Sequence, residues 1–572
     1  MTLPQVIIDV GFASPTVSST VFVIGDPNRG KIGGVGLLGD DDIWTDITPY
    51  VRTWSVRRGA TRGDDPTMRY EPGTCTIELN DGDRRFDPEN ATGPYSLGGV
   101  SQIEPMRRVR IRAIWDGVTY PVFSGFADDW APAYQGNSWT YTTLTATDAQ
   151  KVFAAYDRTG GVAVGAGEDS GARIDRILDG VGWPADDRVI DVGDSTLQAT
   201  ELTGNTLTEL LLVQDSEQGE FYVDASGRTV FRRRLAMIEE PRSTTPQVVF
   251  GDGGYYPTSV WNFEDGVGAF TATGATITAS AAEAQSGTQS MLMTVVGSPA
   301  LAYPRQIYGL PVVAGHSYTG TIWVLYPNGG SVSTAIDWSN SGGYISTSSG
   351  PTVVPAGVWT QLSITGTAPL TATRAGFGPT LTGSPATGTE LYVDSMTLAD
   401  DDNEIPYADA HPSVGDDGMA NTITASRAGG TEQTVQDTTS VTRYLVKTFQ
   451  RLDLLLQTDA AVLEWANIVK YQFATPARRF SSVDFNTARI DTQVSQWPQV
   501  LGREFADRIT VRRRPAGGGA LIERDCFVRG VTHESDGVAW RSTFVLQSAE
   551  RYSFFIVGDA VLGRLDSNAL SF

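Results

Sequence analysis

One block of the chain, residues 255–402, differs sharply in composition from the sequence on either side. It contains no lysine, its only arginines are Arg305 and Arg374, and Ser, Thr, Gly and Ala dominate it. Short runs of alternating apolar and polar residues recur within it, at Met291–Val296, Ser317–Tyr326, Val358–Gly366 and Glu390–Leu398. Alternation with a period of two, separated by loop-rich connections, predicts an all-β sandwich. The block is therefore expected to be a domain of its own.

Length and charge limit the remaining possibilities. The chain has 572 residues, which predicts about four domains at roughly 150 residues each. Its 43 Lys+Arg against 66 Asp+Glu give a net charge of −23, which argues against nucleic-acid binding because phosphate binding needs a basic surface.

Two cysteines, Cys75 and Cys526, cannot supply a disulfide framework or a cysteine-based zinc site. His316, His411 and His533 lie far apart in the sequence, so we expect no histidine-built metal site.

No apolar run approaches the roughly 18 residues that a membrane-spanning helix needs. The first basic residue is Arg29 and Pro4 interrupts the start, so we expect no secretory signal with a basic leading region.

The flanking sequence predicts strands with a few helices. Alternation predicts strands at Thr74–Leu79, Arg108–Trp115, Trp139–Asp148, Asp525–Glu534 and Ala539–Ser548, with Cys75 in the core. Helical spacing predicts a helix over residues 174–181 and a stronger one over Thr458–Phe473, whose apolar stripe is Val462, Trp465, Ala466 and Val469.

Two further local patterns make specific predictions. Thr206 and Glu209 have the spacing of a capping box, which predicts that a helix begins at Thr206. Residues 220–234 predict a hairpin, with Arg232–Arg234 expected on a solvated edge strand that discourages sheet association.

Few motifs suggest chemistry. Residues 34–39 match GxGxxG, but Asp40–Asp42 follow directly and would repel a phosphate, so we expect a flexible loop. Residues from Gly558 onward are expected to form a loose tail. No nucleophile–base arrangement is apparent, and although a glycosidase pair of carboxylates stays open, we predict that the protein is not an enzyme.

Residues 255–402 resemble jelly-roll carbohydrate-binding modules of the family-4-like kind. The resemblance lies in Trp261–Gly266, Gly315–Val324, Gly357–Gly366 and Tyr392–Leu398. It implies that the first and last strands meet at a structural calcium ion, with Glu264 and Asp394 as candidate ligands. The alternative is that these residues are a cap or exposed carboxylates.

Sugar binding requires exposed aromatic faces. Trp323 and Trp359 match structural positions of the family and are expected in the core. Trp338 and Tyr344 fall in a polar, loop-like stretch and are the candidate glycan-binding residues. The alternative is a decoration domain without a ligand.

Without this block, Val248–Gly254 joins Asn403–Asp409 and the sequence reads as one continuous protein. It resembles minor tail proteins of long-tailed bacteriophages of actinobacteria, which lie at the tail tip and are related to baseplate hubs. The matching segments are Trp44–Gly59, Tyr70–Asn90, Phe123–Trp130, Asp175–Pro184, Ser216–Arg234 and Asn421–Gly430.

The two resemblances together predict a mainly β, minor α protein. We expect a β hub domain (1–155), an α+β hub domain (156–254), the inserted jelly roll (255–402), a continuation of the hub domain (403–480) and a C-terminal β domain with a tail (481–572). The tail-protein resemblance implies β-barrel-like hub domains in a homotrimer at the distal tail tip of the virion, made in the host cytoplasm. The implied partners are a distal tail protein, the tape-measure protein and other tip proteins. The net charge of −23 adds the hypothesis of an acidic lumen that DNA passes without sticking.

The inserted module is expected to bind host cell-wall polysaccharide. Two alternatives stay open: a secreted carbohydrate-binding adhesin or accessory module of a carbohydrate-active enzyme, and a hub that cleaves peptidoglycan.

Overall fold

The computed structural model describes most of the chain. The described residues are 3–12, 44–61, 63, 65–97, 99–135, 139–158, 162–252, 259–305, 310–402, 404–486, 493–515, 520–552, 554–555 and 569–570. The GxGxxG segment with its aspartate run lies outside these residues, as does most of the predicted C-terminal tail. Among the described residues no helix is long and apolar enough to cross a membrane.

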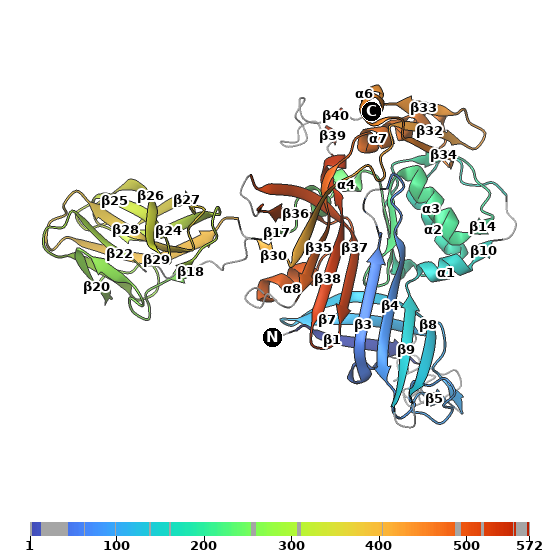
Figure 1. Ribbon diagram of the computed structural model, residues 1–572, viewed down its shortest axis with the longest axis horizontal. Helices are drawn as coiled ribbons and strands as arrows, with labels where there is room; N and C mark the ends of the chain where they lie inside the picture. The colour runs from blue at the N-terminus through green and yellow to red at the C-terminus, as the bar shows by residue number, and fades with distance from the viewer. Residues whose placement is uncertain are drawn as a thin grey trace, which may run out of the picture. The chain divides into compact units, whose positions relative to one another are not determined.

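The chain divides into two compact units (Figure 1). The host unit comprises Met1–Phe250 and Tyr407–Phe572, and the inserted unit comprises Gly251–Pro406. The inserted unit begins and ends a few residues outside the predicted range of 255–402.

A large, mostly antiparallel sheet forms the body of the host unit. Its strand order is β2-β1-β7-β8-β9-β4-β3-β37-β36-β17-β30, with β38, β35 and β31 branching from β37. The strands are β1 (Gln5–Gly11), β2 (Trp44–Asp46), β3 (Val51–Gly59), β4 (Glu71–Asn80), β7 (Arg108–Trp115), β8 (Val118–Gln135), β9 (Trp139–Thr147), β17 (Val249–Gly251), β30 (Ile405–Pro406), β31 (Asp409–Val414), β35 (Arg478–Asn486), β36 (Arg508–Arg513), β37 (Ile522–Ser535) and β38 (Trp540–Ser548). The predicted strands in these regions are present, and Cys75 is buried as expected.

The rest of the host unit combines helices with two small sheets, β12-β16-β15 and β33-β32-β34. Its elements are α1 (Gln150–Ala155), α2 (Ser170–Gly180), β12 (Arg188–Ile190), α3 (Thr206–Glu217), β15 (Glu220–Val223), β16 (Thr229–Arg232), α4 (Ala236–Glu239), α5 (Pro241–Thr244), β32 (Thr422–Arg427), β33 (Gln433–Gln436), α6 (Thr438–Tyr444), β34 (Thr448–Leu454), α7 (Asp459–Phe473) and α8 (Gln493–Leu501). Strands predominate over helices in the described residues as a whole, which confirms the predicted mainly β, minor α fold class.

One hydrophobic core of the host unit is built from both sides of the insertion. Ile174 and Val213 precede the insertion in the sequence, Ile423 and Trp465 follow it, and all four lie in the same buried cluster. The ends of the insertion are also fixed within the host unit. Phe250 packs on Phe485 at 4.7 Å between ring centroids, and the Tyr407 hydroxyl donates to the carbonyl of Arg512. The host fold is therefore continuous across the inserted residues.

Helix α7 matches its predicted stripe. Val462, Trp465, Ala466 and Val469 are all buried in this shared core, and Thr458 caps the helix by accepting from Ala461 N. Regular apolar spacing together with a good cap explains why this helix was predictable.

The helix predicted to begin at Thr206 does begin there, as α3, but the capping box was wrong. The residue that caps α3 is Asn205, whose side chain accepts a hydrogen bond from Thr208 N at 3.3 Å. The hydroxyl of Thr206 instead donates to the carbonyl of Tyr156 at 2.9 Å. The Thr206 hydroxyl therefore binds the backbone carbonyl of Tyr156 and does not cap the helix, as the sequence spacing had predicted it would.

The solvated edge predicted for Arg232–Arg234 was also wrong. Strand β16 lies between β12 and β15, so it is the central strand of its sheet. The Arg232 side chain is buried and pairs with Glu220 and Glu240. Arg233 pairs with Asp194 and Glu239. Charged runs of this kind look alike in sequence whether their partners are water or acidic side chains.

The inserted unit is a sandwich of two antiparallel sheets (Figure 1, yellow-green strands). The first has the order β20-β21-β29-β24-β27, with β18 beside β29, and the second has the order β19-β22-β28-β25-β26, with β23 beside β28. The strands are β18 (Ser259–Trp261), β19 (Thr271–Thr273), β20 (Ala275–Ser280), β21 (Ser290–Val295), β22 (Leu301–Arg305), β23 (Leu310–Pro311), β24 (Ser317–Leu325), β25 (Gly330–Asn340), β26 (Gly343–Val354), β27 (Thr360–Thr367), β28 (Arg374–Thr382) and β29 (Glu390–Asp400). The core between the sheets includes Met291, Ile322, Ile336, Phe377 and Val393.

Candidate functional site

An open cleft of about 500 Å³ lies on the outer face of the second sheet of the sandwich. Alternation along each strand creates it: residues of one parity enter the core, and those of the other parity face outward. The outward residues that line the cleft are Leu301, Tyr303 and Arg305 on β22, Gly376, Thr380 and Thr382 on β28, Ser333, Ala335 and Asp337 on β25, and Tyr344, Thr347 and Ser349 on β26. The central strands β28 and β25 contribute small residues such as Gly376, Ser333 and Ala335 to the floor of the cleft. Tyr303 on β22 and Tyr344 on β26 lie on either side of them.

Arg305 is the most constrained side chain of the cleft. It is buried, its Nε donates to Asp337 at 2.9 Å, one Nη donates to the carbonyls of Pro304 and Pro379, and the other donates to the Thr380 hydroxyl. Burial lowers the pKa of Arg305, although the adjacent Asp337 carboxylate acts in the opposite direction. The guanidinium also lies 4.9 Å from the centre of the Tyr303 ring, within cation–π range. Its donors are thus used within the protein.

Asp337 links the two sides of the cleft. Its second carboxylate oxygen accepts from the Thr347 hydroxyl at 2.5 Å, and that hydroxyl lies 3.0 Å from the hydroxyl of Tyr344. The Tyr344 side chain is anchored at its polar end while 61% of the residue stays exposed. An exposed, anchored aromatic beside fixed polar groups is suited to a sugar ring, which needs an apolar face and directional hydrogen bonds.

Of the two predicted glycan-binding residues, only Tyr344 lies in the cleft. Trp338 is 1% exposed, belongs to the sandwich core, and donates from Nε1 to Ser348 Oγ at 3.0 Å. The loop expected around it is in fact strand β25, on which Trp338 shares its inward parity with Val332 and Ile336. The prediction for Trp338 was therefore wrong.

Trp323 and Trp359 were predicted to lie in the core, and this prediction was also wrong. Both are partly exposed and neither belongs to the core cluster. On β24 the inward positions are Tyr318, Ile322 and Val324, which places Trp323 on the outer face of the first sheet.

The candidate calcium ligands hold one loop from two sides. Glu264 accepts from Thr288 N and Gln289 N, and Asp394 accepts from Gln285 N at 2.9 Å and Ser286 N at 3.0 Å. Hydrogen bonds from the Thr288 side chain and from these backbone groups lower the pKa of Glu264. The two residues that the resemblance paired thus meet on the segment 285–289, where protein N–H groups supply their partners. Calcium at this loop stays a prediction.

Sequence reasoning missed Tyr303, Arg305, Asp337 and Thr347. A signal was present for Arg305, since it is one of only two basic residues in the block. A buried arginine in a β domain with so few basic residues is expected to have a specific acidic partner.

Comparisons with known proteins add two kinds of structural neighbour. No family model and no curated protein matches the chain. A tail protein of prophage MuSo2 from Shewanella oneidensis is 9% identical, with a TM-score of 0.41 over 96% of this chain and 99% of that one. The tail protein from Neisseria meningitidis MC58 is 7% identical, with a TM-score of 0.41 over 95% and 96% of the two chains.

The other neighbours are carbohydrate-binding modules that match a smaller part of the chain. The C-terminal family 22 module of Clostridium thermocellum Xyn10B is 19% identical, with a TM-score of 0.22 over 28% of this chain and 99% of that one. The structural neighbours of the chain thus include phage tail proteins over nearly its full length and family 22 modules over a smaller part.

Proposed function

We propose that this protein is a structural component of a phage tail whose inserted unit binds polysaccharide on the surface of the host bacterium. The host unit would form the hub at the distal tip of a long-tailed particle. The inserted unit would hold the particle on the cell surface through the cleft that contains Tyr303 and Tyr344. No catalytic step belongs to this proposal.

The observation that carries the proposal is a core of the host unit that residues before and after the insertion build together. Such a core is expected if a complete tail protein received a binding domain in one of its loops, where an insertion costs little when the loop ends are already close. The segments whose sequence resembles tail proteins, such as Trp44–Gly59 and Asn421–Gly430, likewise lie on both sides of the inserted unit.

The cleft supports a neutral polysaccharide as the ligand. Arg305 and Asp337 neutralise each other, and the other lining side chains are uncharged. The open cleft carries Tyr303 on β22 and Tyr344 on β26, whose aromatic faces suit sugar rings. The ligand class that we propose is therefore a neutral host cell-wall glycan.

Assembly forms a further part of the proposal. A homotrimer would carry three clefts, so that a weak single-site affinity becomes useful avidity. The expected neighbours in the particle are a distal tail protein, the tape-measure protein and other tip proteins.

The binding proposal is tested with the full-length chain and polysaccharide purified from the host cell wall. We expect the wild-type protein to bind, and Tyr344→Ala to bind about tenfold more weakly because one aromatic face is lost. Tyr134→Ala is the matched control, since Tyr134 is 58% exposed and lies in the host unit. The proposal fails if the wild-type protein does not bind, or if both variants bind as it does.

A further inference from the structure

A group of buried acidic side chains surrounds a histidine where the last strand of the sandwich ends. His316 lies in the loop before β24, Asp400 ends β29, and Asp402 and Glu404 follow it. The side chains of His316, Asp400 and Glu404 are at most 1% exposed, and Asp402 is partly buried. The group is separate from the cleft residues.

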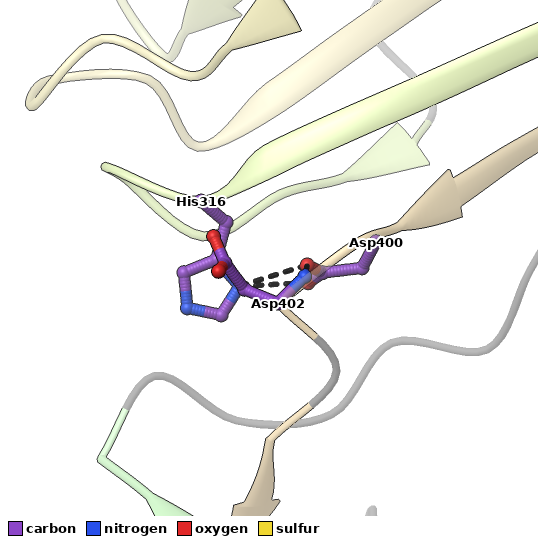
Figure 2. A group of neighbouring side chains, drawn as sticks. All are labelled: His316, Asp400 and Asp402. Atoms are coloured by element: carbon purple, nitrogen blue, oxygen red, sulfur yellow. Dashed lines mark hydrogen bonds and ion pairs between the residues drawn. The ribbon is translucent and has the colours of Figure 1, made fainter. Parts of the chain in front are cut away.

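The donor atoms of three of these residues converge. Nδ1 of His316 lies 2.8 Å from Oδ2 and 3.0 Å from Oδ1 of Asp400. A ring nitrogen of His316 and one carboxylate oxygen each of Asp400 and Asp402 lie within 4.8 Å of one another. Figure 2 shows the two carboxylates converging on the imidazole ring.

Backbone hydrogen bonds hold the two carboxylates in place. Asp402 N donates to Asp400 Oδ1 at 3.1 Å, and Ser317 N donates to Asp402 Oδ2 at 2.8 Å. Ligand positions fixed by surrounding hydrogen bonds are a usual feature of protein metal sites.

Oxygen atoms supply most of the possible ligands in this group. Three carboxylates surround one imidazole. Carboxylate oxygens and imidazole nitrogens are both common ligands of divalent metal ions.

The second ring nitrogen of His316 also has an unusual environment. Nε2 is buried, has no hydrogen-bond partner among the described residues, and lies 3.6 Å from Oε2 of Glu404. Histidine ligands of metals generally present their other ring nitrogen to a carboxylate. A metal on Nδ1 would take the place of the hydrogen shared with Asp400 and leave Nε2–H facing Glu404.

We propose that His316, Asp400 and Asp402 bind a divalent transition-metal ion of the Zn²⁺ class, with Glu404 orienting the imidazole. One imidazole nitrogen and two carboxylates form a mixed N/O donor set that suits zinc or cobalt, whereas calcium takes oxygen ligands almost exclusively. The sequence-based expectation of no histidine-built site considered histidine pairs, and this site uses one histidine with acidic residues that follow it by more than eighty positions.

Such an ion would tie the end of β29 to the loop before β24. Because it would bind the folded form, it would stabilise the inserted unit against unfolding by mass action. This site is independent of the glycan proposal and of calcium at the loop between Glu264 and Asp394.

The test uses full-length protein dialysed against a chelator and then titrated with Zn²⁺ in a calorimeter, with Co²⁺ absorption as a spectroscopic check. We expect one Zn²⁺ per chain. Asp402→Asn, at a partly exposed position, should weaken binding at least tenfold, and Glu404→Gln should weaken it about 10–100-fold. Circular dichroism establishes that each variant is folded.

His411→Asn is the matched control, because His411 is a half-exposed histidine in the host unit that lies 3.0 Å from Asp484. It should bind Zn²⁺ as the wild-type protein does, and so should Glu264→Gln. The proposal is overturned if the wild-type protein takes up no stoichiometric Zn²⁺, or if folded Asp402→Asn and Glu404→Gln both bind it with unchanged affinity.

Discussion

The carboxylate of Asp337 accepts a hydrogen bond from Nε of Arg305 at 2.9 Å on the floor of the cleft. The pair joins strands β22 and β25, and Asp337 extends the connection to Thr347 on β26. A buried arginine is tolerated here because each of its nitrogen atoms has an acceptor. The pair thus shapes the cleft and neutralises it.

Removing the Asp337 charge should destabilise the inserted unit. Asp337→Asn leaves the Arg305 guanidinium buried without its counter-ion, and breaking a buried pair from one side costs about 3 kcal/mol. We expect roughly 2 kcal/mol, because Asp337 is itself partly exposed to water. Urea denaturation of the full-length chain measures the change. Asp416→Asn, at an exposed pair with Lys447, is the control and should leave the transition unchanged.

Asp148 should make the host unit less stable as the pH rises. Burial raises the pKa of Asp148 to about 7, against the opposing effect of hydrogen bonds from Gly73 N and Gln150 N. In the unfolded chain its pKa is about 3.9. Between these values the folded form keeps a proton that the unfolded form has lost, so the free energy of unfolding falls as the pH rises from about 4 to about 7.

Asp148→Asn isolates this effect, because the asparagine does not titrate. Relative to the wild-type protein, the variant should gain a few kcal/mol of stability between pH 5 and pH 8, on the order of the shift itself. Denaturant titrations at both pH values measure the difference between the two proteins. A difference that stays the same at pH 5 and pH 8 would contradict the raised pKa.

Calcium binding at Glu264 and Asp394 is decided by melting experiments. If the family resemblance carries over, Ca²⁺ should raise the melting temperature of the inserted unit after chelator treatment, and Glu264→Gln should abolish that increase. If Ca²⁺ has no effect on the wild-type protein, the two carboxylates serve only to hold the segment 285–289 through its N–H groups.

Excision of the inserted unit should leave the host unit folded. Its two main cores contain residues from both sides of the insertion and none from within it. A chain that lacks residues 253–404 and carries a short Gly/Ser linker should therefore unfold cooperatively and keep a strand-rich circular dichroism spectrum. Aggregation or loss of cooperative unfolding in this chain would show that the host fold depends on the inserted residues.

Much of the fold could be predicted from local patterns. Strands β4, β7 and β9 alternate regularly, and helix α7 has both a regular stripe and a cap. In these elements the face toward the core is visible in the sequence, because the opposite face is consistently polar.

The candidate site was harder to predict because both faces of β25 carry polar residues. Ser333 and Asp337 face the cleft, while Thr334 is buried on the face that also carries Trp338. The sequence of β25 therefore does not show which of its residues face the core, and Trp338 was wrongly predicted to be exposed. The prediction that Arg232 is solvated was wrong for a related reason. Its acidic partner Glu220 lies on the neighbouring strand, and no spacing in the sequence indicates that the two residues pair.

The most direct test of the account is an electron cryo-microscopy reconstruction of the tail tip of the phage particle that carries this chain. We predict density for the host unit in a threefold ring at the distal end of the tail tube, with each inserted unit accessible at the outer surface. Absence of the chain from purified particles, or its location away from the tail tip, would contradict the central claim.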